Sequence, residues 1–148
     1  MPEIDPRLAT IDSCLYRLAV KAIILRGDKV LMVRERDDEW WSLPGGGVEY
    51  GDDVITALKR ELQEELGLKQ QDIETDGKVV YVYVGAVVQG IPKANLFYRV
   101  VVKADHFSPT ADVLEADWFD TKEIQDMFIS PSTGGAKQVA AIIQALSS

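Results

Sequence analysis

Three glutamates gathered in one short stretch are the first residues of this sequence that could do chemistry. Glu61, Glu64 and Glu65 fall within five positions. On a helix, at about 100° per residue, their carboxylates would share an arc of roughly 100° and repel one another by a few tenths of a kcal/mol per pair. A solvated surface helix would account for any lone pair of glutamates. A divalent cation accounts for all three, because hard cations such as Mg²⁺ take carboxylate oxygens.

A glycine-rich loop leads into this acidic stretch. WWSLPGGGVEYGDD, at 40–53, contains Pro44 and the three consecutive glycines 45–47. Glycine allows backbone atoms to approach a metal or a phosphate closely, and the start of a helix favours anions. Three glycines alone usually form an ordinary turn. Placed before the acidic stretch, they favour a site for a metal or a phosphate.

A helix must hold these acids in place, and we expect it at about 53–66. Asp52 or Asp53 can cap its start, and Gly67 stands where a glycine commonly ends a helix. Arg60 precedes Glu64 by four positions, which makes an attractive pair on a helix. The acids would flank a buried apolar stripe and be partly shielded from water. That stripe comprises Ile55, Leu58, Leu62 and Leu66.

The remaining elements are expected from apolar, β-branched runs and the turns between them. We expect strands at 15–26 and 30–36, joined by a turn at 27–29. Two more strands, at 78–90 and 95–104, would pair across a loop that contains Ile91 and Pro92. A strand at 112–120, a short helix at 121–128, a loop at 130–135 and a final helix at 136–146 complete the chain. This mixture predicts an α/β or α+β fold with the sheet between helices.

Size, charge and cysteine content limit the class of protein. With 148 residues, 47% hydrophobic and 27% charged, the chain suits one globular domain at 1–148. No apolar run reaches the roughly 20 residues needed to cross a bilayer. The first residues lack signal-peptide features and Cys14 is the single cysteine, so we expect a cytoplasmic protein without a membrane partner. The net charge of −8 argues against polymeric nucleic acid as a partner, and leaves a small anionic substrate held by a local cation.

Taken together, the acids and glycines resemble a known family signature. Gly46, five residues, Asp52, seven residues and then RELQEELGL are similar to the Nudix box, which would span 46–68. The family pattern is Gly, five of any residue, Glu, seven of any, then Arg-Glu-aliphatic-any-Glu-Glu-any-Gly-aliphatic. The one departure is Asp52, which stands where the family has glutamate. The lead-in WWSLPGG and the strand pattern also resemble the family, so the likeness extends over most of the chain.

The resemblance implies a fold and an activity. Nudix proteins share an α/β/α sandwich with a mixed β-sheet between helices, and most hydrolyse a nucleoside diphosphate linked to another group, using Mg²⁺ or Mn²⁺. Arg60 would orient the acids by ion pairing, partly with Asp52, which is one methylene shorter than the glutamate of the family. Carried over by position, the metal ligands would be Glu61, Glu64, Glu65 and the carbonyl of Gly45.

Two further roles follow from the same resemblance. Glu61 is the candidate to act as base or to position the attacking water, although the base of some family members lies on a distant loop. Glu115, three residues before Trp118, resembles a downstream acid that completes the metal site in some members. A solvent-facing strand residue is an equally good interpretation of Glu115, and Asp112 and Asp117 compete for the role.

Residues that would contact the substrate are harder to read from the sequence. Arg34 and Arg36 alternate along one strand face and would meet phosphates, and a solvated face is the ordinary alternative. Trp40 or Tyr50 would stack on a base, whereas ordinary packing is the alternative for each.

The leading interpretation is a metal-dependent pyrophosphohydrolase that releases a nucleoside monophosphate, with nucleoside triphosphates as the favoured substrates, as in the MutT-like group. Nucleotide sugars and dinucleoside polyphosphates are alternative substrates. A non-catalytic Nudix module that senses a nucleotide is disfavoured by the retained acids. A prenyl diphosphate isomerase would need a cysteine near the site, and Cys14 lies far upstream of the box. Family members are often dimers, so a homodimer is a further expectation.

Overall fold

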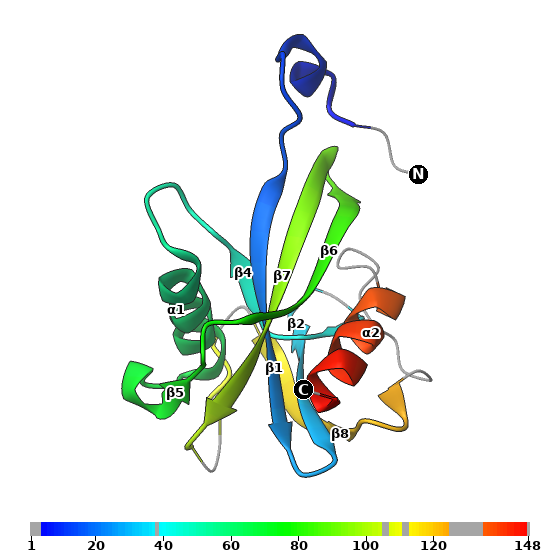
Figure 1. Ribbon diagram of the computed structural model, residues 1–148. Coiled ribbons are helices and arrows are strands. Elements are labelled where there is room, and N and C mark those ends of the chain that lie inside the picture. The colour runs from blue at the N-terminus through cyan, green and yellow to red at the C-terminus, as the bar shows by residue number, and fades with distance from the viewer. Residues whose placement is uncertain (1–3, 38, 105–106, 111–112, 125–134, 148) are drawn as a thin grey trace.

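The computed structural model describes residues 4–37, 39–104, 107–110, 113–124 and 135–147 (Figure 1). Its helical elements are η1 (Pro6–Thr10), α1 (Val54–Leu66), η2 (Gln70–Asp72) and α2 (Gly135–Leu146). Its strands are β1 (Arg17–Arg26), β2 (Lys29–Glu35), β3 (Trp41–Ser42), β4 (Gly45–Gly47), β5 (Ile73–Glu74), β6 (Val79–Val88), β7 (Ile91–Val102) and β8 (Val113–Asp120). Among the residues described, no helix is long and apolar enough to span a membrane.

One mixed sheet organises these elements. Its main path runs β3-β2-β1-β7-β5, with β4 paired to β1, β6 to β7 and β8 to β2. β1 and β7 run parallel, and the other pairs are antiparallel. β1 pairs with β4 at residues 19–21 but with β2 at residues 25–26, so one edge of β1 serves two different neighbours. This division leaves the short strand β4 beside the first half of β1, where it meets α1 (Figure 1).

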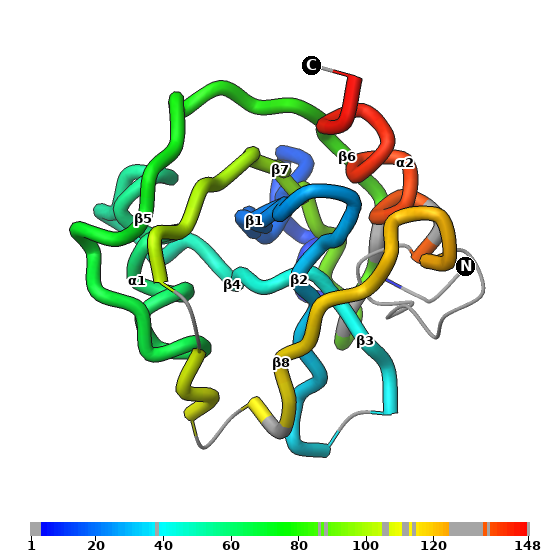
Figure 2. Tube along the Cα trace, turned by 90° about the horizontal axis from the view of Figure 1, so that it is seen from below, coloured from blue at the N-terminus to red at the C-terminus, as the bar shows by residue number. Residues whose placement is uncertain are grey.

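The two longer helices cover opposite faces of the sheet. α1 packs on β1 and β4, whereas α2 packs on β6 and β1 (Figure 2). Alternation along β1 serves both sides, because Val20 and Ala22 belong to the apolar cluster under α1, whereas Ile23 belongs to the cluster with Ile142 of α2. The prediction of a mixed sheet between helices is confirmed.

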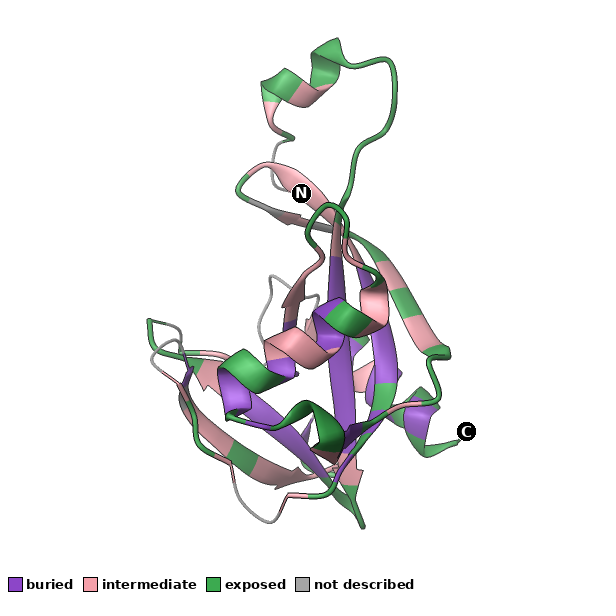
Figure 3. Ribbon diagram, turned by 90° about the vertical axis from the view of Figure 1, so that its left-hand side faces the viewer, coloured by how far each residue is buried: buried purple, intermediate pink, exposed green. Residues whose placement is uncertain are grey.

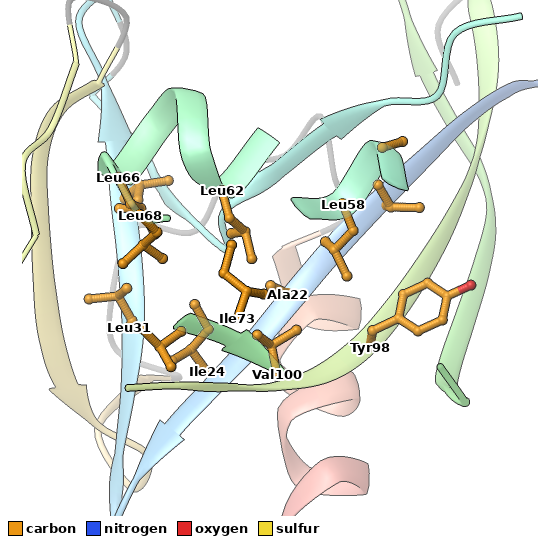
Figure 4. Packing of buried hydrophobic residues seen from close by; sticks show 14 of the residues in the cluster. Ala22, Ile24, Leu31, Leu58, Leu62, Leu66, Leu68, Ile73, Tyr98 and Val100 are labelled. Carbon is orange, nitrogen blue, oxygen red and sulfur yellow. The ribbon is translucent and has the colours of Figure 1, made fainter. Parts of the chain in front are cut away.

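The apolar stripe of α1 attaches the acidic helix to the sheet. Leu58, Leu62 and Leu66 are fully buried and point toward Ala22 and other apolar side chains of the sheet (Figure 4). Burial of each leucine contributes about 1.5–3 kcal/mol. Ile55, expected in the stripe, is only partly buried, whereas Ala57 is fully buried. Figure 3 shows that buried and exposed positions alternate along α1.

Both ends of α1 form as the sequence predicts. The Asp53 carboxylate accepts a hydrogen bond of 2.9 Å from the Thr56 N–H, which caps the first turn. At the other end Gly67 adopts a φ of +67°, which an L side chain rarely adopts, and its N–H donates to Gln63 O at 3.0 Å. The helix therefore covers 54–66, within one residue of the prediction.

Two strand predictions are wrong in detail. The stretch 40–53 is not only a loop, because it contains β3 and β4, which are too short and too glycine-rich to be read as strands. Ile91 and Pro92 lie in β7 rather than in a loop. The turn before them is made by Gln89 and Gly90, whose φ angles of +53° and +80° form a tight two-residue connection.

Other predictions fall partly outside the residues described. The β1–β2 hairpin and the strand 113–120 form as expected, and α2 begins one residue before the predicted 136. Of the short helix predicted at 121–128, the described residues 121–123 form a turn. Residues 125–128, most of the predicted loop 130–135 and Asp112 lie outside the described residues.

Candidate active site

A cleft of about 610 Å³ brings together the three glutamates and the three consecutive glycines. Glu61, Glu64 and Glu65 line it from α1, and residues 45–47 line it from β4, on which α1 packs directly. The other lining residues come from the end of β2 and from the stretch that leads into β8: Glu35, Arg36, Asp37, Thr110 and Val113.

Glu65 is the most deeply buried of the three acids, with 7% of its surface exposed. The Gly45 N–H donates a hydrogen bond of 2.8 Å to its Oε1. Burial raises the pKa of Glu65 from the usual 4.5 to about 8, although Lys21 and the hydrogen bond from Gly45 act in the opposite direction. Without a further cation beside it, this carboxyl group is largely protonated at neutral pH.

Glu61 is partly buried and lies against β4. A Cβ built on Gly46 would lie 2.5–2.7 Å from the Glu61 carboxyl atoms, so this approach requires glycine. Burial, followed by repulsion from Glu64, raises the pKa of Glu61, whereas Arg60 and Lys21 lower it. Glu61 therefore holds a proton more tightly than an exposed glutamate does.

The neighbouring glycines of β4 are required for different reasons. Gly45 has a φ of +145°, and a Cβ there would overlap the carbonyl of Val20 on β1. A Cβ on Gly47 would overlap the guanidinium group of Arg17. The glycine-rich stretch thus allows β1, Glu61 and Arg17 to approach one strand from different sides.

Arg60 supports the acidic face through an ion pair with Asp52. Its Nη1 donates to Asp52 Oδ2, and its Nη2 lies 4.0 Å from Glu61 Oε1. The hydrogen bond to Asp52 is the main reason why the pKa of Arg60 is raised. The aspartate of this box therefore reaches the arginine despite its shorter side chain. Glu64 is exposed and attracts Arg60 only at longer range, so the expected pair between positions 60 and 64 is not the dominant one.

The carboxylate oxygens in the cleft are the ligand type that a hard divalent cation prefers, but their present positions do not form a complete ligand set. Among the described residues, no three acidic, histidine or cysteine side chains stand together as a group that could hold a metal ion. Glu65 binds the Gly45 N–H, Glu61 lies on Gly46, and Glu64 is exposed. All three nevertheless line one cleft with carboxylate oxygens, which Mg²⁺ prefers. Burial raises the pKa of Glu65, so a cation placed beside it would favour its charged form.

Of the other predicted site residues, only Arg36 lines this cleft. Glu115 and Arg34 face each other across β8 and β2 and form an ion pair. The Arg34 guanidinium also lies over the Trp41 ring, 5.8 Å from its centre. Glu115, the predicted downstream acid, is therefore paired with Arg34, a predicted phosphate contact. Neither residue lines the cleft.

The two candidates for stacking on a base lie apart from the acids. Trp40 is partly buried immediately before β3, and Tyr50 is fully exposed and lines a separate hollow of about 510 Å³. Trp41 of β3 contacts Phe119 edge-on at 4.8 Å between ring centres. Asp117 accepts a hydrogen bond of 2.8 Å from the Trp118 N–H and does not line the cleft.

Lys21 and the cleft residues Glu35 and Asp37 were not predicted from the sequence. Lys21 is buried on β1, donates a hydrogen bond of 3.3 Å to Leu43 O and attracts both Glu61 and Glu65. One signal was present, because Lys21 interrupts the apolar run LAVKAIIL. No signal in the sequence places the end of β2 beside α1, because that contact depends on how the sheet is paired.

The chain is similar to known proteins in sequence and in fold. The model of the NUDIX domain family matches residues 15–139. The RNA pyrophosphohydrolase of Francisella tularensis subsp. mediasiatica (strain FSC147) is 38% identical over 65 residues, which are 43% of this chain and 42% of that protein. The matched stretch thus spans less than half the length of that relative.

Two solved structures share the fold. A UDP-X diphosphatase superposes with a TM-score of 0.78 at 18% identity, covering 93% of this chain and 66% of that one. An ADP-ribose pyrophosphatase from Streptococcus suis 89-1591 superposes with a TM-score of 0.69 at 24% identity, covering 90% and 94%. Because the family match extends from before β1 into α2, and includes the whole acidic helix, the chain belongs to the Nudix family.

Proposed function

We propose that this chain is a metal-dependent hydrolase that cleaves a phosphoanhydride in a nucleoside diphosphate linked to another group. The observation that carries the proposal is the cleft in which Glu61, Glu64 and Glu65 of the box meet the glycines of β4. The names of the relatives support it, because one is called an RNA pyrophosphohydrolase and others a diphosphatase and a pyrophosphatase. All three split phosphorus anhydrides.

The residues that would hold Mg²⁺ or Mn²⁺ are Glu61, Glu64, Glu65 and the carbonyl of Gly45. When bound, such a cation neutralises phosphate charge and makes water easier to deprotonate. Glu61, partly buried beside Gly46, is our candidate to take the proton of the attacking water or to position that water. Arg60, fixed by Asp52, holds the acidic face in place, and Arg36 at the cleft wall would contact a phosphate.

The reaction then balances as a simple hydrolysis. The water oxygen forms a bond to a phosphorus of the anhydride while the bridging P–O bond breaks. The two products are a nucleoside monophosphate and the remaining phosphate compound. The water proton passes to the carboxylate and then to solvent or to the leaving group.

Nucleoside triphosphates are the favoured substrates in this proposal, and nucleotide sugars and dinucleoside polyphosphates are the alternatives. The name of the Francisella relative makes RNA a further candidate substrate. The net charge of −8 disfavours a long polyanion, because extended contact with a phosphate backbone requires clustered positive charge. We further propose a cytoplasmic location and a homodimer.

The direct experiment replaces Glu64 and Glu65 by glutamine together and measures the release of nucleoside monophosphate with and without Mg²⁺. The substrate panel comprises nucleoside triphosphates, oxidised triphosphates, nucleotide sugars and dinucleoside polyphosphates. We expect Mg²⁺-dependent turnover in the wild type and a loss of at least about 100-fold in the double variant. The exposed Glu123→Gln change is the matched control and should retain full activity.

Wild-type turnover in the double variant would refute the assignment of the acids. If the wild-type chain binds nucleotides but releases no nucleoside monophosphate from any member of the panel, the chain is a nucleotide-sensing module instead.

A further inference from the structure

A cluster of positive charge lies next to the acidic cleft, on the α2 side of the sheet. Arg17 and Lys21 of β1 share the face of Ile23, which packs in the cluster under α2. Lys93 of β7 is the register partner of Arg17, so the two side chains leave adjacent strands on that same face. Two lysines and an arginine therefore gather in a chain whose net charge is −8.

Carboxylates neutralise this cluster only in part, since each of its cations has an acid nearby but none forms a close, buried ion pair with a described residue. Arg17 lies 3.8 Å from Glu49 in an ion pair in which both side chains are well exposed. Lys21 donates to a backbone carbonyl. The pKa of Lys93 is lowered by burial and then by the charges of Lys21 and Arg17, and Glu35 is the acid that opposes this shift. Like charges that are crowded and half-buried repel one another, and an anionic ligand would relieve that repulsion. A cation would do the same for the crowded glutamates.

An amide without a partner lies two residues further along the same face. Asn95 is fully buried, and its Nδ2 and Oδ1 form no hydrogen bond in the structure as far as it is described. Lys93, Asn95 and Phe97 alternate on β7 with residues of the opposite face, and Phe97 belongs to the cluster under α2. A buried amide with unused donors is costly unless a ligand or water satisfies it.

The thin glycine strand β4 separates this cluster from the acids. A Cβ on Gly46 would meet Glu61, whereas one on Gly47 would meet Arg17. Lys21 pairs in register with Gly45 and attracts both Glu61 and Glu65. Glu35 lines the cleft, and its negative charge raises the pKa of Lys93. The cations are therefore close enough to interact electrostatically with acids that line the cleft.

We propose that Arg17, Lys93 and Asn95, with Lys21 beneath them, form a subsite for an additional phosphate group, which selects substrates with three or more linked phosphates. Arg17 and Lys93 supply the charge, and the fully buried Asn95 amide donates to a phosphate oxygen once a neighbouring side chain moves aside. A diphosphate sugar has no third phosphate to place there. This inference rests on the proposed function and narrows its substrate class to nucleoside triphosphates and longer polyphosphates.

The test uses inorganic tripolyphosphate and pyrophosphate as probes, titrated calorimetrically into the full chain with Mg²⁺ present, because both probes then meet the same cation at the glutamates. We expect tighter binding of tripolyphosphate in the wild type. Lys93→Gln should weaken tripolyphosphate binding about tenfold and pyrophosphate binding less than twofold, and Lys93→Arg should restore it. Arg17→Gln, at a more exposed position, is the second variant and should act in the same direction. Lys78→Gln, exposed and just before β6, is the matched control and should bind as the wild type does.

Equal losses for both probes, a loss in Lys78→Gln of the same size, or the absence of tripolyphosphate binding in the wild type would each overturn the subsite. A kinetic readout accompanies the titration, in which Lys93→Gln raises KM for triphosphates with little change in kcat and leaves KM for nucleotide sugars unchanged. Failure of the proposed function is distinguishable, because a chain without turnover on any substrate would still give the predicted order of probe affinities.

Discussion

At the scale of single residues, the main feature of the cleft is the buried carboxyl group of Glu65. Glu65 lies beneath β4, bonded to the Gly45 N–H, and its pKa of about 8 follows mainly from burial. Burial is also the main reason why the pKa of Glu61 is raised. The sequence places these acids on one helix face, but it does not reveal how deeply each is buried, because that depends on β4 lying over α1. A cation would favour the charged form of both groups.

This burial predicts how the stability of the metal-free chain changes with pH. Below pH 4.5 Glu65 is protonated in both the folded and the unfolded chain, and its contribution is fully present. Between pH 4.5 and about 8 only the folded chain holds the proton, so the free energy of unfolding falls as pH rises, by an amount on the order of a few kcal/mol. Urea denaturation in EDTA at several pH values measures this slope.

Glu65→Gln provides the control for the slope, because glutamine has the same shape and does not titrate. The difference in stability between wild type and variant should change across that pH window, and Mg²⁺ should stabilise the wild type most at its alkaline end. A difference that stays constant with pH would show that Glu65 titrates as an exposed glutamate does.

At the scale of elements, the geometry of the site depends on α1 and β4 together. α1 could be predicted closely, since Asp53, Gly67 and the leucine stripe give it a start, an end and a buried side. β4 could not, because a three-residue glycine strand has no hydrophobic pattern and forms only by pairing with β1. Pro92 was read as part of a loop for a related reason, since its place in β7 depends on the positive φ angles of the preceding turn.

Because Glu61 lies against β4, one methyl group added to that strand should disturb the site. Gly46→Ala would place a Cβ at 2.5–2.7 Å from the Glu61 carboxyl atoms, which must move away. Because Glu61 is the end of a flexible side chain, we expect a small change in melting temperature but a fall in kcat of about 10–100-fold. Melting curves and steady-state kinetics separate the two effects. Unchanged kcat in a folded Gly46→Ala variant would exclude Glu61, in its present position, from the reaction.

At the scale of the whole molecule, pairing across the sheet assembles what the sequence keeps far apart. The end of β2, the segment before β8 and the acidic helix converge on one cleft, and β7 brings Lys93 beside Arg17. The fold class and the acids could be predicted because they follow from local patterns. Glu35, Lys93 and Asn95 could not, because their positions depend on long-range register. The ion pair between Arg34 and Glu115 likewise follows from the pairing of β2 with β8.

In the proposed site, three glutamates of α1 hold a divalent cation against the glycine strand β4. The most direct test is the anomalous diffraction of Mn²⁺ in crystals grown with the metal and a nucleotide. We predict one strong peak within coordination distance of the carboxylates of Glu61, Glu64 and Glu65, on the side facing Gly45. A manganese peak elsewhere, with those carboxylates turned into solvent and the nucleotide bound away from them, would contradict the account.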